Sequence, residues 1–395
     1  MAPAAVVMFS HYGNQGGFRV RTATTLRSLF LGIAVLLAST SAQADIKSFN
    51  ASVKARDFKA AAADAVATWP TLDKSRADIA IIAREFGFTA LVAKDFAAAK
   101  TFGEAAVAAS ATLSESADLR ATSDVLRDVA NHKLSPSPAT RDQLVRSLEA
   151  RVGQGGIDLI SYFAADVATA YDFERGAWAE AQASASLSRK LSQQGGDLYQ
   201  VYAFRFDLFA NVAEYMRTRD AKVYAQLVTL RRETIAAIDA APSDAGADPI
   251  ADFYWEVEAW RPSIGQHLVS RRKMKWPDSP EVNPYRTEDR STRLLGFRAA
   301  DAGCESIIEM RRDIRYPSSA LFKGLIGVVM LRVDIDAQGA ASNPEIVTAV
   351  PDKYFGEAVL RSVKDIRYKP GEKWGAECTL VQPGRVITFE FTVGG

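Results

Sequence analysis

The stretch RYPSSALFKGLIGVVMLRVDIDAQG, residues 315–339, determines how the C-terminal part of this 395-residue chain folds. It begins with Tyr316-Pro317, and after Gly327 its apolar residues recur at every second position. That period predicts a β-strand with one buried face. The residues expected to face the core are Val329, Leu331, Val333 and Ile335.

The residues after this strand predict a hairpin and then a helix. Residues 336–339, Asp-Ala-Gln-Gly, form a turn, and residues 345–347 lie in the returning strand. Pro351-Asp352 is expected to cap a helix that ends at Tyr368-Lys369-Pro370. Its apolar face repeats at intervals of four and three residues. That face consists of Phe355, Val359, Val363 and Ile366.

The segment RVITFEFTV, residues 385–393, is predicted to be the last strand, with Phe389 and Phe391 facing the core. Residues 301–395 therefore form a small α+β domain of order β-β-α-β. Because no later strand follows, we expect the outer edge of the last strand to be unpaired. The residues predicted to bind a partner at this edge are Arg385, Val386, Thr388, Glu390 and Thr392, the last three with outward side chains.

The longer N-terminal part, residues 45–240, has the pattern of a mainly α domain. Alanine is frequent, and apolar residues recur at three and four positions. Residues 55–58, Ala-Arg-Asp-Phe, resemble residues 93–96, Ala-Lys-Asp-Phe, and a related turn follows Phe173. This self-similarity resembles degenerate tetratricopeptide repeats and predicts a helical-repeat domain. An irregular helical bundle is the alternative.

Residues 241–300 are predicted to hold one further helix and a charged linker. APSDAGADP, residues 241–249, breaks the helical pattern, and three prolines occur within residues 276–285. The basic run of residues 271–275 is interpreted as a solvated linker face. Because the formal net charge of the whole chain is only +1, the sequence predicts no nucleic-acid partner.

Residues 1–44 have the features of a secretory signal peptide. Three arginines precede an apolar core, residues 29–38, which is short for a membrane span, and Ala42-Gln43-Ala44 matches a cleavage site. We expect cleavage between Ala44 and Asp45 and export of the chain. An uncleaved inner-membrane anchor is the alternative, and membrane contact is expected only in that case.

The chemistry-bearing residues of the exported chain are few. No nucleophile, phosphate-binding or metal-binding motif is found, and His132 and His267 are far apart, so no catalytic, cofactor or metal site is predicted. Cys304 and Cys378 are the only two cysteines. In an exported chain they are expected to form a disulfide, with two unrelated buried thiols as the alternative.

Residues 305–395 resemble the C-terminal domain of TonB-type energy transducers. The resemblance implies a periplasmic domain in a Gram-negative bacterium. Its implied partner is the TonB-box segment of outer-membrane receptors, which adds as a strand to a sheet edge. The matching features are Tyr316-Pro317, Gly327 opening a strand, Asp334 with Gly339, Phe355 with Ala358 and Val363, and Tyr368-Lys369-Pro370.

The chain departs from the transducer pattern in three places. The apolar segment of residues 29–38 holds neither Ser nor His, and a helical domain replaces the Pro-rich spacer, so proton-coupled work by this chain alone is not implied. Leu321 stands where some members place a receptor-contacting Gln, and is therefore a candidate partner contact. The rival functions are a periplasmic scaffold for another envelope partner and an enzyme with its site in the helical domain.

Overall fold

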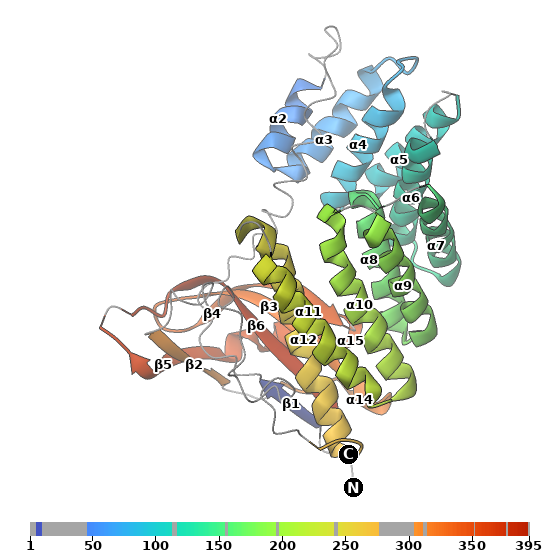
Figure 1. Cartoon of the computed structure of the whole chain (residues 1–395). Coiled ribbons are helices and arrows are strands. Elements are labelled where there is room, and N and C mark those ends of the chain that lie inside the picture. The colour runs from blue at the N-terminus through green and yellow to red at the C-terminus, as the bar shows by residue number, and fades with distance from the viewer. Residues whose placement is uncertain are drawn as a thin grey trace. The chain divides into compact units, whose positions relative to one another are not determined.

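The structure is a computed structural model of the 395-residue chain (Figure 1). It describes residues 5–9, 46–112, 117–154, 157–194, 197–240, 244–275, 304–310, 314–350, 352–376 and 378–393. Two compact units are distinguished. One comprises residues 1–25, 172–182 and 204–395, and the other residues 26–171 and 183–203.

The N-terminal region is helical, as the alanine-rich pattern predicts. The helices are α2 (Lys47–Ala55), α3 (Phe58–Thr68), α4 (Ile79–Val92), α5 (Phe96–Thr112), α6 (Ala117–Leu134), α7 (Pro138–Gly153), α8 (Leu159–Arg175), α9 (Trp178–Gln194), α10 (Asp197–Thr218), α11 (Lys222–Ala240) and α12 (Asp244–Ser270), with a 3₁₀ turn, η2 (Trp69–Thr71), after α3.

The two similar tetrapeptides, residues 55–58 and 93–96, form the same turn between helices. Arg56 and Lys94 both adopt left-handed backbone, with φ of 63° and 64°. The next N–H in each donates to a carbonyl five positions back, at 3.0 Å and 2.9 Å, which ends the preceding helix. Asp57 and Asp95 then cap the following helix through hydrogen bonds of 2.9 Å and 3.0 Å. Gly176, with φ of 68°, ends α8 in the same way.

The C-terminal region is a small β-rich domain with two sheets, which confirms the predicted α+β class. The larger sheet has the order β1-β6-β3-β4 with every neighbouring pair antiparallel, and the smaller pairs β2 with β5. The strands are β1 (Ala5–Phe9), β2 (Cys304–Met310), β3 (Gly327–Ile335), β4 (Ala341–Val350), β5 (Ile366–Trp374) and β6 (Gln382–Val393). The helices are α14 (Ser318–Phe322), α15 (Asp352–Ser362) and η4 (Val363–Asp365).

The predicted order β-β-α-β corresponds to β3, β4, α15 and β6, but the β2–β5 sheet was not predicted. The helix ends at Ser362 rather than at Tyr368-Lys369-Pro370, and Ile366 begins β5. The turn of the β3–β4 hairpin supplies a physical reason. Tyr368 N–H donates to the Gly339 carbonyl at 2.7 Å, which holds this segment extended beside the turn.

One face of the larger sheet packs on α15 and on the turn before α14. Phe355 of α15 lies 4.4 Å from Phe391 between ring centroids, and Tyr316 lies 5.5 Å from Phe355 and 5.7 Å from Phe391. A Cβ on Gly327 would meet the Phe355 ring and, at 2.7 Å, the Val350 carbonyl oxygen. This close approach is the reason that β3 begins with glycine.

The expectation of a single buried face for β3 is wrong. Val328 and Met330, on the opposite side from Val329 and Leu331, are also buried. Within the same compact unit, α12 contacts both β3 and β6 (Figure 1). Because α12 covers the second face, β3 is buried on both sides, and a nearly continuous apolar run replaces strict alternation.

Candidate partner-binding edge

The last strand, β6, is fixed in the sheet by its pairing with β3. The register places Phe389 opposite Val329 and Ile387 opposite Leu331, and all four side chains are buried. Phe389 and Phe391 have no exposed surface, as the alternation in the sequence predicts. The apolar face of β6 therefore anchors the strand, and its backbone is left to pair on the side away from β3.

A second strand pairs with β6 on that outer side, contrary to the expectation of an unpaired edge. β1 runs antiparallel to β6, from Ala5 opposite Val393 to Phe9 opposite Phe389. Residues 382–388, which include Arg385, Val386 and Thr388, have no outer partner strand within the described part of the chain. The expectation of an open edge rested on the absence of a later strand, whereas the pairing strand, Ala5–Phe9, precedes the domain in the sequence.

The side chains expected to point outward from β6 do not form an exposed row. Glu390 and Thr392 are 1% and 2% exposed, and Thr388 is half-buried. The contact of α12 with β6 is the physical reason, because it covers the face that the alternation assigned to solvent. Arg385 is buried too, with its guanidinium 5.5 Å from the centre of the Tyr368 ring. A partner at this edge would therefore bind the backbone N–H and C=O groups of β6 rather than these side chains.

A short helix, α14, follows the Tyr316-Pro317 turn and precedes β3. The Tyr316 hydroxyl donates to the Leu325 carbonyl, and burial raises the pKa of this tyrosine well above its ordinary value. Leu321 is half-buried, whereas its neighbour Phe322 is 91% exposed. Sequence reasoning named Leu321 and missed Phe322. A large apolar residue at the end of so short a helix was the available signal, but a five-residue helix shows no periodicity to orient its side chains.

A polar cluster at the C-terminal ends of α10 and α12, within the same unit, contacts the loop after α14. Arg219 donates to the Gly324 carbonyl at 3.2 Å, and its guanidinium lies 5.4 Å from the centre of the Tyr215 ring. Arg271 Nε donates to His267 Nε2 at 3.0 Å, so the proton of this neutral ring is on Nδ1, which donates to the Tyr215 hydroxyl at 2.7 Å. Burial first, and then nearby cations, lowers the pKa of His267 from 6.5 to about 4.

The two cysteine positions lie near one end of the smaller sheet. Cys304 begins β2 and pairs in register with Trp374 of β5, four positions before Cys378. The Cys378 Sγ accepts a hydrogen bond from the Gly375 N–H at 3.2 Å, and no free cysteine occurs among the described residues. This arrangement supports the disulfide, which stays a prediction.

The remaining sequence expectations concern export, membranes and metals. Ala44, Asp45 and the apolar segment of residues 29–38 lie outside the described residues. None of the described helices combines the length and apolarity needed to cross a membrane. Within the described ranges, no group of three or more His, Cys, Asp or Glu side chains is arranged to hold a metal ion.

Comparison with known families identifies the domain that carries this edge. Residues 312–391 match the family described as Gram-negative bacterial TonB protein C-terminal. The match spans α14, β3, β4, α15, β5 and residues 382–391 of β6, so it covers most of the strand that forms the edge. The chain matches no curated protein and no solved structure.

Proposed function

We propose that this chain, through its TonB-type C-terminal domain, captures an extended segment of an outer-membrane receptor at the outer edge of β6. The family is envelope-associated and acts in transport rather than in catalysis. The observation that carries the proposal is the β1–β6 register, in which residues 389–393 accept an antiparallel strand through main-chain pairing. A receptor segment would use the same backbone groups.

Export would remove β1 from the outer edge of β6. β1 lies upstream of the Ala42-Gln43-Ala44 cleavage pattern, so processing after Ala44 would remove it from the mature chain. If the leader were instead retained as an anchor, β1 and β6 would lie on opposite sides of the membrane and could not pair. In either case the periplasmic form would have an open edge from Gln382 to Val393, and β1 would act only as an intramolecular occupant before export.

The chemistry of the edge indicates what it would recognise. Main-chain pairing is tolerant of side chains, and the buried Glu390 and Thr392 are not available to select a partner. Phe322, five residues before β3 begins opposite Phe391, is the most exposed large apolar side chain among the described residues, and we infer that it contacts a bound segment. We therefore expect the β6 backbone to supply most of the affinity for the bound segment, and Phe322 of α14 to supply part of the selectivity.

Peptide binding to residues 45–395 and to the full chain tests this function. The probes are a labelled peptide with the sequence of residues 4–10 and the plug segment of a TonB-dependent receptor from the same bacterium. We expect residues 45–395 to bind both probes, and the full chain to bind them at least about tenfold more weakly because β1 competes. A version of each peptide that is N-methylated at every second backbone nitrogen lacks the N–H donors that would pair with β6, and it should not bind.

Two variants separate the edge from nonspecific apolar binding. Phe322→Ala should weaken receptor-segment binding without changing the free energy of unfolding, because its side chain is almost fully exposed. Leu134→Ala, at another exposed apolar side chain, is the matched control and should have no effect on binding. Binding of the N-methylated peptides as strongly as the parents would contradict main-chain capture at this edge.

A further inference from the structure

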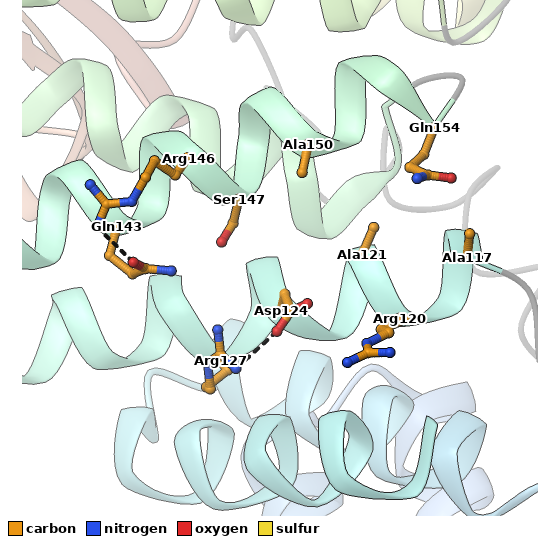
Figure 2. Close-up of a pocket in the computed structure, with 10 residues that line it drawn as sticks. All are labelled: Ala117, Arg120, Ala121, Asp124, Arg127, Gln143, Arg146, Ser147, Ala150 and Gln154. Carbon is orange, nitrogen blue, oxygen red and sulfur yellow. Dashed lines mark hydrogen bonds and ion pairs between the residues drawn. The ribbon is translucent and has the colours of Figure 1, made fainter. Parts of the chain in front are cut away.

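A polar groove lies between α6 and α7 in the helical unit formed by residues 26–171 and 183–203 (Figure 2). Its volume is about 420 Å³. Small side chains form its middle, with Ala121 on α6 facing Ser147 and Ala150 on α7. Because these side chains are short, the two helices leave an open channel along their shared side.

Arginines line the groove and outnumber the acidic residues there. Arg120, Arg127 and Arg146 contribute to the lining, against Asp124 alone. Arg120 and Arg127 come from α6 and Arg146 comes from α7, so both walls carry positive charge (Figure 2). The chain as a whole is nearly neutral, which makes this local excess a feature of the groove rather than of the molecule.

One of the three arginines is already compensated. Arg127 binds Asp124 at 2.8 Å and the buried Asp128 at 2.8 Å. Asp128 also accepts from Gln143 at 3.1 Å and from the Ser147 hydroxyl. These two carboxylates and Arg127 form an internal network with one more negative than positive charge, so the three arginines and two aspartates leave the groove a net charge of +1.

Among the described residues, neither Arg120 nor Arg146 forms an ion pair with a carboxylate, so both charges are available to a ligand. The bond described for Arg146 is to the neutral amide oxygen of Gln143, at 2.7 Å. Arg120 has no hydrogen-bond or ion-pair partner within the residues that the structure describes, and both side chains are exposed. Guanidinium groups bind carboxylates with two parallel hydrogen bonds, so each is suited to one acidic side chain.

The spacing of the two free arginines suits an extended peptide. Arg146 lies at the end of the groove near Arg127, because Gln143 and Arg127 share Asp128. Arg120 is seven residues from Arg127 on the same helix, which is about 10 Å along its axis. Three residues of extended chain span about 10 Å as well.

We propose that this groove binds an extended acidic peptide segment with carboxylates about three positions apart. The ligand class is a protein segment rich in Glu or Asp, bound along the small residues of the groove and held at both ends by Arg120 and Arg146. This site is in a different compact unit from β6, and it does not depend on the function proposed for that edge.

Arginine side-chain NMR of the full chain tests the assignment. The probe is the peptide Glu-Ser-Ser-Glu-Ser-Ser-Glu, blocked at both ends, and its counterpart with Gln in place of Glu. We expect the Nε–Hε signals of Arg120 and Arg146 to shift with the Glu peptide alone. The double variant Arg120→Gln, Arg146→Gln should bind about tenfold more weakly, since it loses two charge-assisted contacts.

The matched control is Lys59→Gln with Lys190→Gln, which removes the same charge from exposed positions in the same unit. It should bind the Glu peptide like the parent, and affinity should fall between about 50 and about 200 mM salt. Three results would overturn the proposal: equal loss in the control, equal binding of the Gln peptide, or no shift at Arg120 and Arg146 with millimolar peptide. Binding of anionic phospholipid vesicles without any peptide binding would assign the groove to lipid instead.

Discussion

At the scale of single residues, His267 shows how packing sets a protonation state. The ring is 1% exposed, its Nε2 accepts from Arg271, and its Nδ1 donates to Tyr215. A proton on Nε2 would have to break the Arg271 bond and would face the additional charges of Arg219 and Lys273. The folded chain therefore keeps this histidine neutral, with a pKa of about 4.

The stability of the protein should consequently depend on pH through His267. Between about pH 6.5 and the folded-state pKa of about 4, the unfolded chain binds a proton that the folded chain does not. The free energy of unfolding should then fall by about 2–3 kcal/mol as the pH decreases across this window. Urea unfolding of the parent and of His267→Gln over this range measures the effect.

The variant provides its own control. His132, whose pKa is also lowered to about 4, is present in both proteins, so the difference between the two curves isolates His267. Parallel curves for parent and variant would show that His267 is not held neutral by its surroundings.

At the scale of the elements, the turns explain why the sequence partly repeats. Residues 55–58 and 93–96 look alike because both must end one helix with a left-handed residue and cap the next with Asp. Arg56 and Lys94 occupy a conformation that costs a residue with a Cβ about 1–2 kcal/mol. Gly176 occupies the equivalent position without that cost.

Opposite substitutions at two of these turns should have opposite effects. Lys94→Gly should raise the free energy of unfolding by about 0.5–1 kcal/mol, because relief of the left-handed strain exceeds the added backbone entropy. Gly176→Ala should lower it by about 1–2 kcal/mol, although a Cβ there would meet nothing closer than 3.6 Å. Chemical unfolding of both variants measures this, and a loss of stability in both would refute the shared turn geometry.

At the scale of the whole molecule, the sequence predicts which segments form strands better than it predicts which elements pack against one another. The alternation of residues 327–335 and 385–393 predicts β3 and β6, because burial of one face leaves a local pattern. The β2–β5 sheet and the burial of Val328 and Glu390 depend on segments distant in sequence, namely the β3–β4 turn and α12. No local pattern encodes such contacts.

The candidate site shows the same division. Sequence reasoning found the strand that carries the edge, and a family model confirms the domain around it. It did not find β1 on the outer side, because pairing between residues 5–9 and 389–393 joins the two ends of the chain. It also missed Phe322, whose exposure depends on how α14 is seated beside the sheet.

Amide hydrogen exchange along β6 tests the central claim most directly. In residues 45–395 without a ligand, amides between Gln382 and Val393 that point toward β3 should already be protected, and those that point outward should exchange rapidly. Addition of the receptor plug peptide should protect the outward amides alone, at every second residue. If the peptide binds while the exchange of these outward amides stays unchanged, the partner does not pair with β6 and the account is wrong.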